Sequence, residues 1–286
     1  AQEHYKSEGN NRVILATDGD FNVGESSNEA MEELIEEKRK EGVFLTVLGY
    51  GIGNLKDSKM EILADKGNGN YAYIDNLNEA RKVLVNEFGG TLFTIATDVK
   101  LQVEFNPATV KAYRLIGYEN RKLNDEDFNN DRKDAGDLGS GHTVTALYEV
   151  IPVGVESAFY AIDDLKYQTT RSSVGSTSEW LTVKLRYKHP NEQGSRLIEQ
   201  IVKRERAGGE PGEDFRWSAC VAAFGMLLRD SQYLNDMTPD AIVALARQAR
   251  GEDPEGYRSE FINLVKSYSV LSRDRVSGEL RKVLRQ

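Results

Sequence analysis

The chain has 286 residues, of which 39% are hydrophobic and 29% charged, as in an ordinary globular protein rather than a disordered one. Its formal net charge of −9 argues against nucleic acid as the main partner, because phosphate binding needs a concentrated basic face. The single cysteine, Cys220, excludes an intrachain disulfide framework and a multi-cysteine metal site, and its apolar neighbours predict a buried structural thiol.

The first predicted element is a strand over residues 12–17, an apolar run that ends on Thr17-Asp18-Gly19-Asp20. The run predicts a buried parallel strand whose carboxyl end carries acidic side chains, where open α/β sheets place their ligand sites. Asp18 and Asp20 are hard oxygen ligands that suit Mg²⁺ or Ca²⁺. The alternative is a turn that merely ends a strand, since Asp and Gly are standard turn residues.

Strands and helices alternate from this run to residue 91. Further strands are predicted over 43–48 and 70–75, and Gly42 and Gly67 lie where helices should end. Three capping-box pairs predict helix starts: Ser26 with Glu29, Ser58 with Glu61, and Asn76 with Glu79. The order βαβαβα predicts a parallel sheet with right-handed crossovers, so the fold class of residues 1–91 is α/β.

From residue 92 the apolar residues recur every second position, which predicts strands around 99–105, 144–150 and 181–187. We therefore expect an antiparallel β-sandwich over residues 92–206. A polar hinge follows at 207–212, and helical periodicity returns over 213–286.

This last region predicts a small α-helical domain. Thr238-Pro239 and Asp253-Pro254 are each interpreted as an N-cap followed by proline at the first helical position. A basic tail suits the C-terminal end of a last solvated helix, with contact to an acidic partner as an alternative; it comprises Arg273, Arg275, Arg281, Lys282 and Arg285.

Thr17-Asp18-Gly19 after an apolar strand, then a helix, then a strand ending at residues 47–51 resembles the second half of a von Willebrand factor type A domain. Residues 11–24, 67–75, 113–121 and 224–229 resemble the bacterial YfbK-like branch of that family.

The resemblance implies an adhesion site that depends on a metal ion. In such sites an Asp-x-Ser-x-Ser motif and a neighbouring threonine bind the cation, and the Thr-Asp-Gly aspartate completes the shell, often through water. Asp18 is the position that matches, and Asp20 is a weaker candidate. The cation would be Mg²⁺, or Ca²⁺ or Mn²⁺, and a protein ligand would donate an acidic group to it.

The sequence departs from this pattern because it contains no Asp-x-Ser-x-Ser. We expect the metal site to be incomplete here and to bind no cation, with the remaining ligands supplied in the full-length protein. The strand that precedes Thr-Asp-Gly in the type A fold is also absent. We therefore expect an exposed sheet edge at residues 12–17, covered by self-association or by an N-terminal fragment.

Two local patterns offer other interpretations. Gly49-Tyr50-Gly51-Ile52-Gly53, with Asp75 downstream, resembles a dinucleotide-binding loop, but its last gap is one residue short. The acidic segment 124–137 could be a Ca²⁺ loop through Asp125, Asp127 and Asn129, but it lacks the turn glycine and the final glutamate. A solvated connection between strands is the favoured interpretation of that segment.

The sequence thus predicts a non-enzymatic interaction protein that binds an unknown protein ligand through a divalent cation in its full-length form, and not nucleic acid. The alternatives are a divalent-metal-dependent hydrolase and an assembly factor that works with an AAA-type ATPase, the latter by analogy alone. The resemblance implies an extracytoplasmic location, periplasmic or anchored to the cell envelope.

Overall fold

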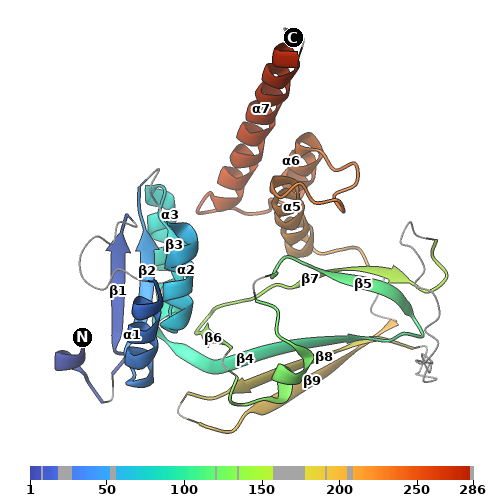
Figure 1. Cartoon of the computed structure of the whole chain (residues 1–286). Helices are drawn as coiled ribbons and strands as arrows, with labels where there is room; N and C mark the ends of the chain where they lie inside the picture. The colour runs from blue at the N-terminus through green and yellow to red at the C-terminus, as the bar shows by residue number, and fades with distance from the viewer. Residues whose placement is uncertain are drawn as a thin grey trace. The chain divides into compact units, whose positions relative to one another are not determined.

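The computed structural model describes residues 1–7, 9–18, 28–51, 56–119, 121–133, 135–156, 178–190, 192–204 and 209–283. Two compact units share the chain. Unit 1 comprises residues 1–104, 123–144 and 182–200, and unit 2 comprises 105–122, 145–181 and 201–286. Figure 1 colours the chain from its N-terminus to its C-terminus. The boundaries predicted at 1–91, 92–206 and 213–286 stay a prediction.

Unit 1 begins with the predicted parallel sheet. After a short 3₁₀ helix, η1 (Gln2–His4), the strands β1 (Arg12–Thr17), β2 (Phe44–Gly49) and β3 (Tyr71–Tyr73) pair in parallel in the order β1-β2-β3. The helices α1 (Asn28–Lys40) and α2 (Asp57–Lys66) connect them (Figure 1). The alternating α/β order predicted for this region is therefore confirmed.

Both connecting helices cover one face of this sheet. Val47 of β2 is fully buried together with Met60, Leu63 and Ala64 of α2, and Met31 and Ile35 of α1 pack against the same cluster. Leu45 and Val47 are two residues apart in β2, so they point to the same face of the pleated strand. In this cluster the apolar face of each helix, with its 3.6-residue repeat, packs on the apolar face of β2, with its two-residue repeat.

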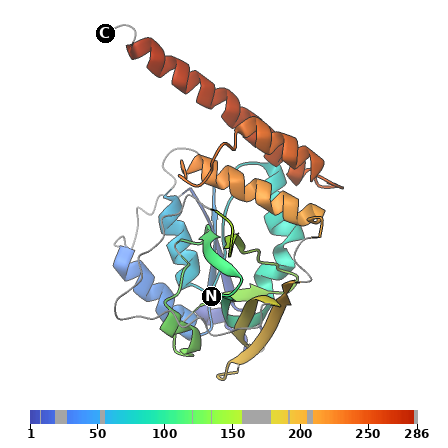
Figure 2. The same cartoon turned by 90° about the vertical axis from the view of Figure 1, so that its right-hand side faces the viewer.

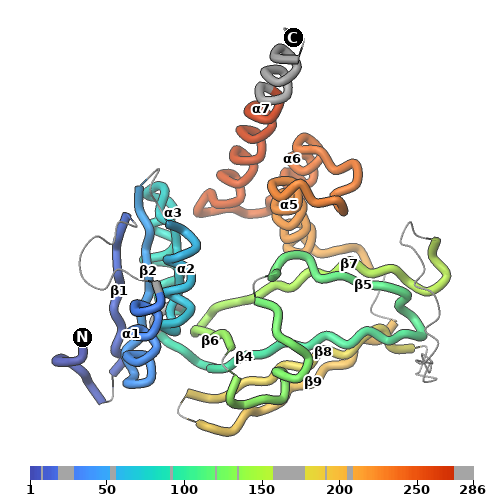
Figure 3. Tube along the Cα trace, in the orientation of Figure 1, coloured from blue at the N-terminus to red at the C-terminus, as the bar shows by residue number. Residues whose placement is uncertain are grey.

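The next segment is a chain of short helical turns. It contains α3 (Leu77–Arg81), the π-helical turn η2 (Lys82–Asn86) and α4 (Phe88–Leu92), which can be followed in Figure 3. Asn76 caps α3, because its side chain accepts a hydrogen bond of 2.9 Å from the Glu79 amide, as predicted. The helix predicted to start at Asn76 is thus interrupted by the π turn.

Antiparallel strands follow, as predicted. One sheet has the order β6-β4-β8-β9, and a separate pair joins β5 to β7. The strand bounds are β4 (Thr94–Phe105), β5 (Val110–Ile116), β6 (Gly136–Gly139), β7 (Leu147–Pro152), β8 (Glu179–Lys188) and β9 (Arg196–Lys203). β5, β6 and β9 were not predicted, and β7 begins three residues after Val144. That these strands form a sandwich stays a prediction.

The C-terminal region of unit 2 is helical, with α5 (Glu213–Leu228), α6 (Pro239–Gln248) and α7 (Tyr257–Val283). All three helices contribute to one apolar cluster, which includes Phe224, Ile242 and Val265. Phe224 makes edge contacts with Phe261 and Tyr268, so α5 lies against α7 (Figure 2). Cys220 is only 3% exposed in this cluster, and burial raises the pKa of its thiol.

The helix starts test the predicted caps. Thr238 accepts a hydrogen bond of 3.2 Å from the Ala241 amide and Pro239 is the first helical residue, as predicted. The Ser58 cap is wrong, because α2 begins at Asp57 and Lys56 is its cap residue. The Asp253 cap is displaced: α7 begins at Tyr257, and the Asp253 carboxylate accepts from the amides of Arg258 and Ser259. Ser26 lies outside the described residues.

Candidate functional site

The carboxyl end of the parallel sheet carries Asp18, the candidate metal ligand. Asp18 follows directly on β1 and is exposed, and the Tyr50 amide donates a hydrogen bond of 2.8 Å to the Thr17 carbonyl beside it. A Cβ atom added to Gly51 would lie 3.7 Å from the Asp18 Cβ. The side chain of Asp18 therefore stands next to the loop that leaves β2, at the sheet edge where it was expected. Asp20 lies outside the described residues.

Gly51 needs its lack of a side chain for its backbone conformation. Its φ is +91°, a region that residues with a Cβ adopt only under strain. The Gly51 carbonyl accepts a hydrogen bond of 2.7 Å from the Tyr73 hydroxyl, and the Ile74 amide donates to the Gly49 carbonyl at 2.8 Å. These bonds join the ends of β2 and β3, so the loop beside Asp18 is fixed from two sides.

A second tyrosine of β3 holds the start of α2. The hydroxyl of Tyr71 donates a hydrogen bond to the Asp57 carboxylate. Burial, followed by this hydrogen bond and the charge of Asp57, raises the pKa of Tyr71 well above its ordinary value. Because Asp57 is engaged in this way, its carboxylate serves the packing of α2 on the sheet.

The residues described at this edge do not complete a cation site. In the ranges that the structure describes, no group of three or more His, Cys, Asp or Glu side chains could hold a metal ion. A hard divalent cation needs about six oxygen ligands. Asp18 supplies one carboxylate, so the described residues alone do not fit Mg²⁺, Ca²⁺ or Mn²⁺.

β1 is the outer strand of the sheet formed by the described residues. Its apolar side chains Val13 and Ile14 are 38% and 42% exposed, whereas Val47 of β2 has no exposed surface. The prediction of a buried strand over 12–17 is wrong in this respect, because β1 pairs only with β2 here. The exposed edge at these residues agrees with the expectation that no strand preceding Thr-Asp-Gly covers β1 here.

The start of β1 is nevertheless anchored. The Arg12 guanidinium donates to the Thr46 hydroxyl at 2.9 Å and lies 5.5 Å from the centre of the Phe44 ring. Burial lowers the pKa of Arg12, and the charge of Asp137 on β6 partly offsets this. The strand therefore has one well-packed polar anchor and an uncovered apolar side.

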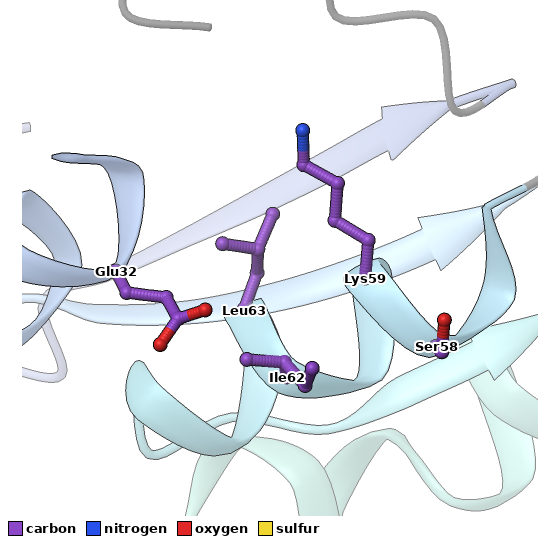
Figure 4. A pocket seen from close by; sticks show the side chains of 5 residues that line it. All are labelled: Glu32, Ser58, Lys59, Ile62 and Leu63. Carbon is purple, nitrogen blue, oxygen red and sulfur yellow. The ribbon is translucent and has the colours of Figure 1, made fainter. Parts of the chain in front are cut away.

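A small pocket lies between α1 and α2 (Figure 4). It encloses about 90 Å³ and is lined by Glu32, Ser58, Lys59, Ile62 and Leu63. This volume corresponds to about three molecules of liquid water. The pocket lies on the helices rather than at the end of β1, so it adds nothing to the Asp18 site.

The acidic segment at 124–137 is held by the protein's own amines. Its residues Asp125–Asn129 form the 3₁₀ turn η3, with Phe128 buried. The Lys100 amine donates to the Asn130 carbonyl at 2.6 Å, and the Lys188 amine donates to the Asp131 carbonyl at 2.7 Å. These contacts favour a connection between strands over a Ca²⁺ loop. Asp134 is outside the described residues.

The dinucleotide interpretation cannot be followed through, because Ile52 and Gly53 lie outside the described residues. The hydrogen bond from Tyr73 to Gly51 is the contact at this edge that sequence reasoning missed. Its only sequence signal is that Tyr71 and Tyr73 are two residues apart, so both project from one face of β3.

Comparison with known proteins gives the family. Residues 90–271 match the model of the C-terminal region of the uncharacterized protein YfbK. The chain belongs to the YfbK C-terminal family. It is 46% identical over 259 residues to the uncharacterized protein YfbK of Escherichia coli (strain K12), an alignment that covers 90% of this chain and 44% of that protein. The resemblance to YfbK-like proteins is thereby confirmed, and the chain spans less than half the length of this relative.

A solved structure is also similar, at a low level. The von Willebrand factor type A protein from Catenulispora acidiphila shares 17% sequence identity, with 89% of this chain and 57% of that chain covered and a TM-score of 0.36. A likeness at this score supports no argument about fold or function.

Proposed function

We propose that the chain is part of a protein that binds a protein ligand at the carboxyl edge of the β1-β2-β3 sheet. The observation that carries the proposal is the exposed Asp18 at the end of β1, next to Gly51 of the neighbouring loop. Ligands of open α/β sheets bind outside the carboxyl ends of the strands. The resemblance of residues 12–51 to half of a type A domain supports the same edge.

The proposal includes a divalent cation in the full-length protein. Asp18 would act there as one oxygen ligand, directly or through water, and the other ligands would come from residues beyond those described. Mg²⁺, Mn²⁺ and Ca²⁺ all accept carboxylate oxygen. Bound by Asp18 alone, a cation would be held no better than by any surface carboxylate.

Binding rather than catalysis is our inference, and it rests on the resemblance to adhesion modules. A metal-dependent hydrolase would need a nucleophile or general base within reach of Asp18. An assembly factor that serves an AAA-type ATPase would use the same edge without turnover. No specific observation on the described residues favours either alternative.

The cation is tested by thermal unfolding of the full-length protein with Mg²⁺ and with a chelator. We expect Mg²⁺ at about ten times its Kd to stabilise the protein by about 1.4 kcal/mol. Asp18→Ala should remove this gain. Asp125→Ala changes an exposed aspartate of η3 and should keep it. Equal stabilisation of the Asp18→Ala protein would contradict the proposal.

The protein ligand is tested by affinity capture with the same proteins. Capture of a defined partner should need Mg²⁺, fail with Asp18→Ala and persist with Asp125→Ala. Turnover of a phosphate or glycosidic substrate, lost in Asp18→Ala, would favour the hydrolase instead.

We also propose that the edge of β1 is covered by a second copy of the chain or by an N-terminal fragment. The exposed Val13 and Ile14 support this. A monomer by light scattering, with a single polypeptide on a denaturing gel, would contradict it.

An extracytoplasmic location stays part of the proposal through the resemblance alone. None of the helices in the described ranges combines the length and the apolar character that crossing a bilayer requires. Fractionation of cells that produce the full-length protein tests the location.

A further inference from the structure

A basic groove lies on the helical part of unit 2. It has a volume of about 410 Å³ and is lined by six residues of α6, α7 and the segment between them: Arg247, Arg250, Ser259, Ile262, Asn263 and Lys266. Three of the six are cations, although the chain carries a net charge of −9. We define this set as the basic groove.

The cations of the groove differ in their partners from three other arginines of unit 2. Arg229 pairs with Glu119, Arg258 with Glu213 and Asp214, and Arg273 with Asp240.

In the basic groove the contacts are neutral. Arg250 donates to the Ser259 hydroxyl at 3.4 Å, and Lys266 donates to the Asn263 side-chain oxygen at 3.3 Å. Within the described ranges no carboxylate makes an ion pair with Arg247, Arg250 or Lys266. The nearby Asp253 carboxylate accepts from the amides of Arg258 and Ser259 and also interacts with Arg250 through its charge. The groove therefore presents positive charge at Arg247 and Lys266 that no ion pair with a described carboxylate neutralises.

The groove has a rigid floor. Ile262 is buried in the cluster that joins α5, α6 and α7, together with Ala246 and Val265. Arg258 also donates to the carbonyls of Ala249 and Arg250, which fixes the end of α6 against the start of α7. The backbone that carries these charged side chains therefore needs no reordering when a ligand binds.

An exposed apolar side chain, Val270, follows these charges along α7. It is 61% exposed. Val270 lies four residues after Lys266, so it continues the helix stripe that Ile262, Asn263 and Lys266 begin. A ligand that filled the groove and followed α7 would meet cations first and apolar surface next.

We propose that the basic groove binds an acidic segment of a protein partner, with glutamate or aspartate on the cations and an apolar side chain against Val270. Arginine suits this chemistry because its guanidinium can donate two parallel hydrogen bonds to one carboxylate. Nucleic acid fits less well, because it rewards a longer basic face than these three cations provide and gains nothing from contact with Val270. The inference does not depend on Asp18 or on a cation.

The test is fluorescence anisotropy with a labelled peptide of glutamate and leucine at helical spacing, titrated with the protein. Saturable binding is expected that weakens as salt is added. The double variant Arg247→Glu/Lys266→Glu should weaken it by about tenfold or more. The control Lys111→Glu/Arg216→Glu makes the same charge change at exposed sites of unit 2 outside the groove, and should bind as the wild type does.

Each remaining outcome would overturn the proposal. These outcomes are no saturable binding up to about 1 mM, equal loss in the control, and equal affinity for a peptide with glutamine in place of glutamate. Tighter binding of single-stranded DNA or inorganic pyrophosphate, lost in the groove variant, would assign the groove to phosphate instead. Circular dichroism of both variants verifies that the helices stay folded.

Discussion

The apolar residues of β1 and those of the C-terminal helices differ in how far they are buried. On α5, α6 and α7 they meet in one cluster, where Ile242, Ala246 and Val265 have no exposed surface. On β1, Val13 and Ile14 remain more than a third exposed. An apolar run therefore indicates that its side chains require a neighbouring surface, but not whether the described residues provide that surface.

The largest expected effect comes from truncating matched isoleucines in the two regions. Ile242→Ala should lower the free energy of unfolding by about 2–5 kcal/mol, because it opens a cavity in a closed core. Ile14→Ala should cost about 1 kcal/mol or less, since the side chain is already partly in water. Denaturant unfolding followed by Trp217 fluorescence in a Trp180→Phe background measures the effect of Ile242→Ala, and circular dichroism of the whole chain measures the effect of Ile14→Ala. Equal losses would mean that another surface covers β1.

The loop beside Asp18 is the next test. Gly51→Ala should cost about 1–2 kcal/mol, because alanine at a φ of +91° is strained, while its Cβ would make only ordinary contact with Asp18. Gly117→Ala also has a positive φ and open space around it, so it is a matched control in the other unit. Thermal unfolding should show that Gly51→Ala lowers the stability of unit 1 and leaves that of unit 2 unchanged.

Thr238 and Ser58 were both predicted as capping residues, but only Thr238 caps its helix. Thr238→Ala should destabilise the helical cluster by about 1 kcal/mol, because it removes the acceptor for the Ala241 amide. Ser58→Ala should change stability by less than about 0.5 kcal/mol, because α2 begins before it and no cap bond depends on it. The denaturant midpoints of the two variants, measured under the same conditions, test this difference.

The smallest effect is expected from the pH dependence of α7. Burial acts to raise the pKa of Asp253, but the hydrogen bonds from Ser259 and Arg258 outweigh it and leave the pKa below its ordinary value. The unfolded chain then binds the proton more readily, so this carboxylate stabilises α7 above about pH 4 and the gain is lost as pH falls through the lowered pKa. Asp253→Asn should show a shallower acid loss of helix by circular dichroism. An unchanged slope would contradict the assignment.

Local patterns predicted two of the helix starts correctly. The pair Asn76 and Glu79 and the pair Thr238 and Pro239 start helices as expected, because a cap is made within four residues. Asp253 shows the limit of this reasoning: its carboxylate reaches amides five and six residues ahead, so the helix begins later than the proline suggested.

Features that depend on distant residues were missed. β9 was not predicted, and its residues are mostly exposed, so no apolar alternation marks it. The position of Asp18 after a strand could be predicted from Thr17-Asp18-Gly19. Its neighbourhood could not, because the bond from Tyr73 to Gly51 joins residues 22 positions apart. The basic groove was likewise hidden, since Arg247 and Lys266 meet only when α6 packs on α7.

The burial of Cys220 has a practical consequence. A thiol so enclosed, with a raised pKa, is slow to react with maleimide or disulfide reagents while the helices are packed. A reporter cysteine introduced on β1 or beside the basic groove can therefore be labelled selectively in the native chain. The rate at which the native thiol reacts then reports how often the helices open, since the thiol reacts only when the cluster around it separates.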